Sequence, residues 1–316
     1  MIQGIQAMAV TDDKIRTSAR WITFFFAAWS VFTALNVMPV LSQGTGSLTG
    51  PVHFLENYES RSDAQHFRLL NSGQQVQLVL DEYSASGFGS KYQYLFGKIG
   101  MSMKLVPGNS AGTVTAYYMS SQTPGLHDEM DFEFLGNVSG QPYILQTNVY
   151  ANGEGKREQR IYLWFDPTAE FHSYSVLWNK QQIIFYVDNT PIRVYKNNKD
   201  IGVPYPDSKA VGIYSTIWNG ENWATNDGWT KLNWTYSPFV ATYESFGVDA
   251  CRVENGNTAS CIAQSNSWWM QSEYQTLGAH QVDELAWVRK NYLLYDYCAD
   301  KKRFPVAPAE CARNPL

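Results

Sequence analysis

Short segments of alternating apolar and polar residues follow one another along the chain after about residue 67. In a β-strand such alternation sends successive side chains to opposite faces. The pattern predicts strands at 76–80, 101–106, 113–119, 146–150 and 160–165, and a hairpin of 174–178 with 183–187. We interpret Gly87, Gly89, Gly97 and Gly100 as turn residues ahead of 101–106. Strands that recur every ~8 to 15 residues predict an all-β protein built as a two-sheet sandwich.

One helix is expected, late in the chain. Residues 281–292 place Val282, Leu285 and Ala286 at helical spacing. No internal repeat and no linker rich in Pro, Gly or Ser divides the sequence after its first segment. We therefore predict three parts: 1–42 as an export segment, 43–245 as the β-sandwich domain, and 246–316 as a C-terminal extension packed on the same domain.

The first segment has the pattern of a secretory signal. Lys14, Arg16 and Arg20 precede the almost wholly apolar residues 21–41. The apolar stretch is long for a signal peptide, so a signal-anchor helix is the alternative. We favour cleavage between residues 34 and 46, because the sequence that follows is soluble in character.

All four cysteines lie in the last quarter of the chain, and export makes disulfides the natural expectation. Short local loops favour Cys251 with Cys261 and Cys298 with Cys311 among the three possible pairings. Their spacing matches no zinc pattern. We expect neither a metal nor a cofactor.

The candidate chemistry lies at 127–137. Glu129, Asp131 and Glu133 alternate with Met130, Phe132 and Phe134, so a strand here carries three acids on one face and three large apolar side chains on the other. Like charges on one face repel, and an arrangement that costs stability indicates a function.

Two glutamates four residues apart in a strand have Cα atoms roughly 13 Å apart. If both side chains lean inward, the carboxyl groups approach to roughly 5 to 6 Å, the spacing of a retaining glycosidase. Glu129 and Glu133 then divide nucleophilic attack and proton transfer between them, and Asp131 tunes the charge of the nucleophile. A calcium site is the bland alternative, but the neighbouring side chains supply too few oxygens. His127 either donates a core hydrogen bond or orders the nucleophile.

Composition narrows the substrate. A formal charge of -5 offers no basic surface for nucleic acid. The chain is rich in aromatic residues, with 11 Trp, 20 Tyr and 16 Phe. Core packing explains most of these rings, but flat rings also stack on sugars, which favours carbohydrate. Two glycosylation sequons begin at Asn137 and Asn233.

The stretch 127–137 resembles the signature of plant xyloglucan endotransglucosylase/hydrolases, within glycoside hydrolase family 16. The resemblance runs from about His53 to Cys311 and includes the two cysteine pairs. Its most specific further stretches are 110–114, 146–149, 157–160, 163–168 and 287–292.

The resemblance implies a two-sheet β-jelly-roll sandwich with a concave substrate cleft. It also implies that Glu129 is the nucleophile, Asp131 its helper and Glu133 the acid/base, with a glycan on Asn137. By the same resemblance the residues that contact sugar are His127, Gln146, Asn148, Arg160, Trp218, Trp223 and, towards the acceptor, Arg303. For the two tryptophans, exposure in a polar loop is favoured over core packing. The sequence departs from the family at 226–229, where Asn-Asp-Gly-Trp replaces a smaller loop, and at the Asn233 sequon.

The expected function is therefore a secreted, monomeric enzyme of the plant cell wall. It cuts the β-1,4-glucan backbone of xyloglucan and transfers the glycosyl group to a second xyloglucan chain, with no nucleic acid and no membrane as partner after signal cleavage. The alternatives are a hydrolase, a transferase that accepts mixed-linkage glucan or cellulose, and a glucan-binding protein without activity. The loop 152–156 looks short, which in the family resembles the transferases.

Overall fold

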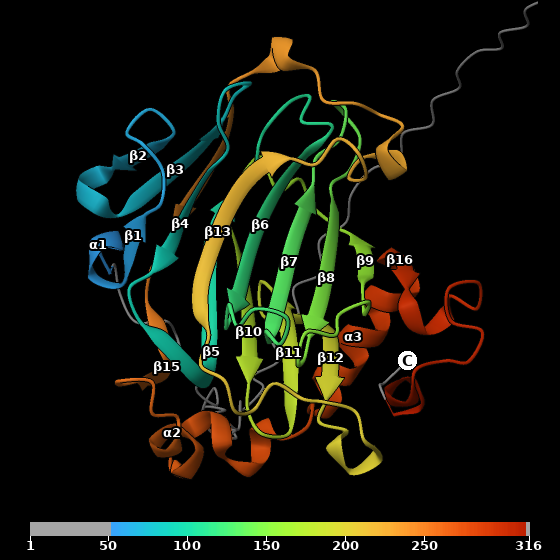
Figure 1. Cartoon of the computed structure of the whole chain (residues 1–316). Helices are drawn as coiled ribbons and strands as arrows, with labels where there is room; N and C mark the ends of the chain where they lie inside the picture. Colours follow the sequence, from blue (N-terminus) through green and yellow to red (C-terminus); the bar gives the residue numbers. More distant parts are fainter. Residues whose placement is uncertain (1–51, 314–316) are drawn as a thin grey trace, which may run out of the picture. The chain divides into compact units, whose positions relative to one another are not determined.

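The computed structural model of the chain describes residues 52–313. The predicted export segment and its cleavage region lie outside these residues. Two eight-stranded antiparallel sheets make up the fold, apart from short helices (Figure 1). The all-β sandwich predicted from the alternation is confirmed.

The first sheet has the order β1-β4-β13-β6-β7-β8-β9-β16. Its strands are β1 (Tyr58–Ser60), β4 (Ser86–Ser90), β13 (Gly212–Asn219), β6 (Thr113–Ser120), β7 (Glu129–Leu135), β8 (Ile144–Tyr150), β9 (Gln159–Tyr162) and β16 (Leu293–Asp296). The acidic segment is thus a central strand with neighbours on both sides.

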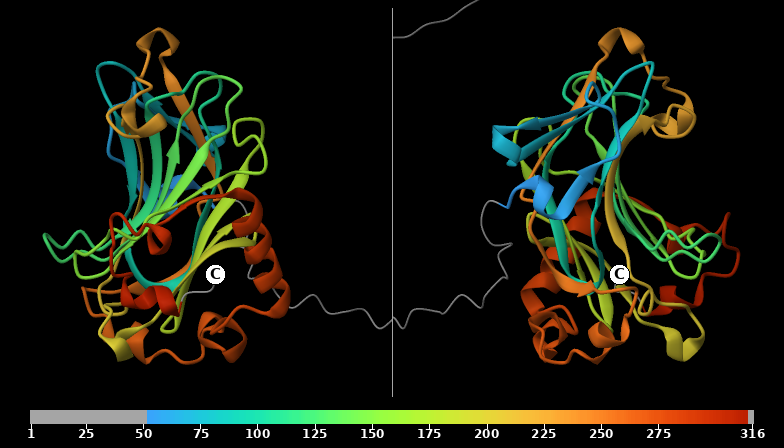
Figure 2. Two further views of the ribbon diagram at one scale, coloured as in Figure 1. Left: turned by 90° about the vertical axis from the view of Figure 1, so that its right-hand side faces the viewer. Right: turned by 60° about the vertical axis from the view of Figure 1, so that its left-hand side comes forward.

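The second sheet has the order β12-β11-β10-β5-β14-β3-β2, and β15 also pairs with β5. Its strands are β12 (Thr190–Lys196), β11 (Gln182–Val187), β10 (His172–Trp178), β5 (Gln93–Lys104), β14 (Phe239–Glu244), β3 (Gln75–Leu80), β2 (Phe67–Leu70) and β15 (Val248–Val253). The predicted hairpin of β10 with β11 is confirmed. Figure 2 shows the two sheets as two layers.

Three α-helices accompany the sheets: α1 (Phe54–Asn57), α2 (Ala259–Ala263) and α3 (Ala279–Tyr292). Helix α3 is the predicted one. It buries Leu285 and Val288, while Val282 is 48% exposed. The buried face of α3 is centred between Leu285 and Val288. At 3.6 residues per turn, Val282 lies at the edge of this face. Eight 3-10 turns complete the description: Asn71–Gly73, Lys199–Ile201, Asn226–Gly228, Trp234–Tyr236, Trp268–Met270, Ser272–Tyr274, Tyr297–Ala299 and Ala309–Ala312.

The interpretation of these four glycines as turn residues was wrong, because Gly87 and Gly89 lie inside strand β4 and Gly97 and Gly100 lie inside the 12-residue strand β5. A Cβ on Gly97 would come within 2.3 Å of Ala250 in β15, and one on Gly100 within 2.6 Å of the Ser175 side chain in β10. The two glycines therefore let neighbouring strands approach β5 closely.

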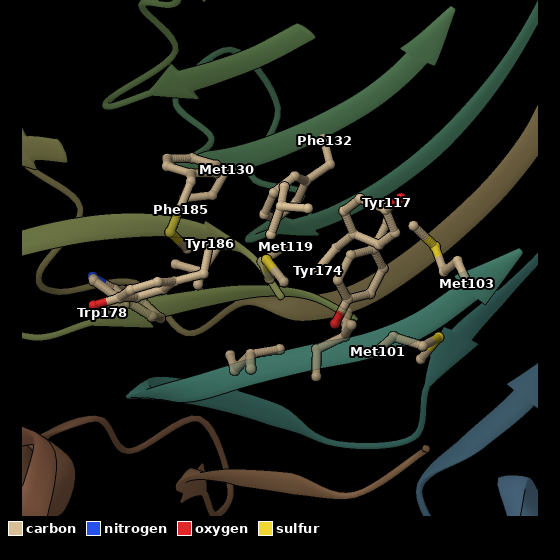
Figure 3. Packing of buried hydrophobic residues seen from close by; sticks show 14 of the residues in the cluster. Met101, Met103, Tyr117, Met119, Met130, Phe132, Tyr174, Trp178, Phe185 and Tyr186 are labelled. Atoms are coloured by element: carbon tan, nitrogen blue, oxygen red, sulfur yellow. The ribbon is translucent and has the colours of Figure 1, made fainter. Parts of the chain in front are cut away.

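The core lies between the sheets, and β7 contributes three of its fully buried side chains: Met130, Phe132 and Phe134. These side chains pack against the second sheet. The ring centroids of Phe132 and Phe185 are 5.1 Å apart, and those of Phe134 and Tyr174 are 4.6 Å apart. Figure 3 shows Met130 and Phe132 pointing into this packed layer. This packing fixes which face of β7 the acids occupy.

The C-terminal segment extends both sheets. Strand β15 pairs with β5 in the second sheet, and β16 pairs with β9 in the first. Disulfides join Cys251 to Cys261 and Cys298 to Cys311, so the predicted pairing is confirmed. In residues 52–313 no helix is both long and apolar enough to cross a membrane.

Candidate active site

Strand β7 places Glu129, Asp131 and Glu133 together on the face of the first sheet opposite the core, which we call the acidic face. The strand pairs without a register shift with β6 on one side and β8 on the other. All three acids therefore project the same way. Asp131 is 7% exposed, and the two glutamates are half-buried.

Glu133 begins a chain of polar side chains across β8 and β9. Gln146 donates its Nε2 to Glu133 Oε2 at 2.6 Å, and Arg160 donates its Nε to Gln146 Oε1 at 2.7 Å. The register puts Gln146 opposite Glu133 and Arg160 opposite Gln146. The chain ends at Asp227, whose Oδ1 lies 3.4 Å from an Arg160 nitrogen.

Asp131 lies between the two glutamates. Burial raises its pKa well above the ordinary aspartate value, and the negative charges of Glu129 and Glu133 and a hydrogen bond with Glu129 raise it further. When Asp131 carries a proton, it can donate that hydrogen bond, and the Glu129 carboxylate then accepts it. Glu129 is therefore suited to attack an electrophilic carbon.

Glu133 is suited to carry a proton. Burial raises the pKa of its carboxyl, while the hydrogen bond from Gln146 and the charge of Arg160 lower it in part. A general acid at neutral pH needs a carboxyl pKa above the usual range. The two glutamates of one strand thus have different partners: Glu133 accepts from Gln146, and Glu129 hydrogen-bonds with Asp131.

Asn148 lies on the acidic face directly opposite Asp131. Its Oδ1 accepts from the backbone nitrogens of Val149 at 2.9 Å and Arg157 at 3.1 Å. Arg157 in turn pairs with the buried Glu310 at 2.8 Å. Asn148 therefore anchors the connection from β8 to β9 as well as lining the site.

His127 and Asp128 hold the start of β7. The half-buried His127 ring stacks on Tyr150, with centroids 4.8 Å apart. Buried Asp128 accepts from the backbone nitrogen of Asn152 at 2.8 Å and pairs with Lys209 at 3.1 Å. These contacts tie the loop 152–156 to the segment just before Glu129.

The two predicted platform tryptophans lie beside one end of β7. Trp218 is in strand β13, not in a loop, and Trp223 is in the turn that follows. Both are half-buried on Val114 and Leu135, and their rings are 6.1 Å apart. Each ring is thus partly covered from below and partly accessible.

Arg303 lies on the β9 side of the acidic face. Its guanidinium binds both Glu158 oxygens, at 2.6 and 3.2 Å, and contacts the Tyr295 hydroxyl at 3.3 Å. The Tyr295 ring lies 6.0 Å from the Arg160 guanidinium carbon. The C-terminal segment therefore reaches the polar chain that starts at Glu133.

The two sequon asparagines lie in different settings. Asn137 follows β7 and is half-buried, with its amide nitrogen 3.0 Å from the Pro142 carbonyl oxygen. Asn233 is exposed, and its Oδ1 accepts from the backbone nitrogen and the hydroxyl of Thr235. Glycans at both positions stay predictions.

Sequence reasoning missed two hollows, one lined partly by β4, β6 and β13 and one beside the end of β8. One, of about 310 Å³, is lined by residues of β4, β6 and β13, among them Tyr118 and Tyr214, with Arg61 over the Tyr214 ring. The other, of about 580 Å³, lies between the 150–158 connection and residues 304–310. The signal for the first hollow in the sequence was the pair of glycines at 87 and 89, which lie on one face of β4 and carry no side chain. Gly87 lines this hollow. In residues 52–313 no group of His, Cys, Asp or Glu side chains is arranged to hold a metal ion.

Comparison with known proteins gives the site its family. The glycosyl hydrolases family 16 profile matches residues 54–236, more than half of the chain, and the profile of the xyloglucan endo-transglycosylase C-terminus matches residues 263–311. The chain belongs to glycosyl hydrolases family 16. Within that family it is a member of the xyloglucan endotransglucosylase/hydrolases, as its relatives show.

Xyloglucan endotransglucosylase protein 2 of Diospyros kaki is 54% identical over 263 residues, or 83% of this chain and 88% of the relative. Xyloglucan endotransglucosylase protein 34 of Populus tremula x Populus tremuloides is 51% identical over 288 residues, or 90% and 97%. Among solved structures, a Bacillus licheniformis beta-glucanase aligns with a TM-score of 0.49 at 22% identity, over 60% of this chain and 89% of that one.

Proposed function

We propose that this family 16 member is a retaining transglycosylase that cuts the β-1,4-glucan backbone of xyloglucan and joins the new end to another xyloglucan chain. One observation carries the proposal: β7 presents Glu129, Asp131 and Glu133 on the same face, and burial raises the pKa of Asp131 and of Glu133. The two relatives, which are 54% and 51% identical to this chain over the aligned residues, support xyloglucan as the substrate.

In the first half-reaction, the Glu129 carboxylate attacks the anomeric carbon as the glycosidic C–O bond breaks. Glu133 gives its proton to the departing oxygen, and the non-reducing fragment stays on Glu129 as an ester. In the second half-reaction, a hydroxyl of the acceptor chain gives its proton to the Glu133 carboxylate. Its oxygen attacks the anomeric carbon, and Glu129 leaves. Two inversions at one carbon retain its configuration.

The remaining site residues bind sugar in this proposal. The residues with that role are His127, Gln146, Asn148, Arg160, Trp218, Trp223 and Arg303. Transfer exceeds hydrolysis when a bound acceptor is already oriented against the ester and excludes water. In this proposal the acceptor chain enters on the β9 side, past the short loop 152–156, whose Asn152 nitrogen bonds to Asp128.

Residues 43–245 then form the catalytic part, and 246–316 form an extension that reaches the acceptor side through Arg303. The N-terminal signal pattern, the two disulfides and the sequons support a secreted glycoprotein of the plant cell wall, which in this proposal acts as a monomer. Cleavage of the first segment releases it from any membrane.

The test is an acceptor assay. The protein is incubated with xyloglucan, with and without labelled xyloglucan oligosaccharide, while polymer size and reducing ends are both followed. We expect label in polymer and few new reducing ends. Reducing ends that rise in step with chain cleavage would instead identify a hydrolase, and the same assay with mixed-linkage glucan or cellulose examines the other donors.

Glu129→Ala is the matched control. It should abolish product formation with sugar or water as acceptor while glucan binding stays measurable. Unchanged turnover in this variant would end the assignment of Glu129. Binding without turnover in the unmodified protein would favour a glucan-binding protein.

A further inference from the structure

Trp229 is 85% exposed, far more than Trp287 at 44%, the other tryptophan counted as exposed among residues 52–313. A single exposed apolar side chain needs no explanation by itself. The loop that carries Trp229 needs an explanation, because its backbone adopts a sterically unfavourable conformation.

Three consecutive residues ahead of Trp229 have positive φ: Asn226 at 50°, Asp227 at 52° and Gly228 at 83°. The first two adopt this conformation against its steric cost, and such residues persist only where the surroundings fix them. Gly228 is required here, because a Cβ would come within 2.2 Å of the Asn222 carbonyl oxygen. The backbone nitrogen of Trp229 also bonds to the Asn226 oxygen at 3.0 Å.

Two anchors join this turn to the acidic face. The buried Thr225 hydroxyl donates to the Gly136 carbonyl oxygen at 2.7 Å, directly after β7, and accepts from the Gly112 nitrogen at 2.8 Å. On its other side, Asp227 pairs with Arg160, the residue that binds Gln146. Trp229 therefore stands two residues from the end of the polar chain that begins at Glu133.

We propose that Trp229 is an additional stacking platform for the acceptor glucan chain, beyond Trp218 and Trp223. This inference rests on the proposed function. Glu133 exchanges its proton with the acceptor oxygen, and its polar partners Gln146 and Arg160 lead towards this loop. A flat, uncharged indole offers a surface for the C–H faces of pyranose rings, and a fixed turn presents it without further loss of entropy. Trp229 touches sugars remote from the bond that reacts, so it sets acceptor length preference.

The test measures transfer to a series of xyloglucan oligosaccharides of increasing length. Trp229→Ala should raise KM about 2- to 10-fold for long acceptors, the range given by one aromatic contact, and leave KM for the shortest unchanged. Trp229→Tyr, which keeps a flat ring, should recover most of the affinity. Trp229→Leu, which keeps apolar bulk only, should behave like alanine.

A KM change that is equal for all lengths, or confined to the donor, would overturn the inference, as would full affinity in Trp229→Leu. Thermal unfolding of each variant checks that the turn is intact, because lost folding lowers kcat for every acceptor alike. Failure of the proposed function is distinct: the unmodified protein would then transfer to no oligosaccharide in the series.

Discussion

At the scale of single residues, Asp131 shows how the site is tuned. It is the most buried of the three acids and lies between two carboxyl groups, so its charged form is costly. The same burial favours the protonated form of Asp131, which can donate a hydrogen bond to Glu129. Stability and activity are therefore opposed at this position.

Asp131→Asn should show this opposition in its pH dependence. The folded-state pKa of Asp131 is raised, so its contribution is fully present below the unfolded value of about 4 and is lost as the pH rises through the folded value. Asparagine does not titrate. The free energy of unfolding of Asp131→Asn, relative to the unmodified protein, should therefore increase from about pH 4 upward, while transfer activity falls.

Urea denaturation at several pH values measures the first effect. A difference between the two proteins that stays constant over this range would contradict the raised pKa of Asp131. Glu133→Gln is a useful companion variant. It removes another carboxyl with a raised pKa from the same face and leaves the hydrogen bond between Asp131 and Glu129 in place.

The three acids could be found from sequence because the alternation at 129–134 fixes both their common face and the buried partners behind them. The polar chain from Gln146 to Asp227 could not. It depends on the register of β7, β8 and β9 and on a turn more than 60 residues away in sequence, and no local pattern encodes such pairings.

At the scale of elements, strand β8 pairs with the acidic strand β7 and is itself held by buried arginines. The connection from β8 to β9 is held by buried Arg157, which pairs with Glu310, and by buried Arg193 of β12. Arg193 donates to the Thr147 carbonyl oxygen at 2.9 Å and to the Arg157 carbonyl oxygen at 2.6 Å. A cation from the second sheet thus fixes a strand of the first.

Glu310→Ala should destabilise the protein by roughly 3 kcal/mol, because it leaves the Arg157 charge buried with no carboxylate partner. Activity should fall as well, since the Arg157 nitrogen holds Asn148. The double variant Arg157→Met with Glu310→Leu should regain part of the stability, because it removes both charges. Urea midpoints and transfer rates provide the measurements.

The ion pair of Arg313 with Asp200 is the matched control, as both partners are exposed. Asp200→Ala should leave the urea midpoint unchanged, since exposed pairs contribute little. An equally small effect of Glu310→Ala would show that water relieves the Arg157 charge.

Strands with clean alternation or β-branched residues, such as β6 and β7, were predictable. Strand β5 was predicted only over its last residues, from 101, because its glycines resemble turn signals until the close approach of β10 and β15 is known. Trp218 was placed in a loop for a similar reason: the Asn and Gly residues after it begin only where β13 ends.

At the scale of the whole molecule, the C-terminal segment contributes to both stability and the site. The loops closed by the two disulfides are similar, with sequence separations of 10 and 13. Only the second loop carries Arg303 and borders the larger hollow. The two bridges should therefore differ in function but not in stability.

Replacing either cysteine pair by serines should cost about 3 kcal/mol, as expected for loops of this length. Loss of Cys298–Cys311 should also raise the KM for the acceptor, whereas loss of Cys251–Cys261 should leave it unchanged. Thermal unfolding and acceptor titrations separate the two effects. Equal changes in KM would mean that the second loop has no special part in acceptor binding.

Strand β16 has one more consequence. Without it, β9 would end the first sheet, and residues Gln159–Tyr162 would show their unpaired backbone N–H and C=O groups to solvent. Exposed strand edges are templates for pairing with other chains and thus for aggregation. The bridge from Cys298 to Cys311 begins two residues after β16 and keeps this cover in place. Reduction of this bridge would then loosen the cover over β9 and should promote aggregation.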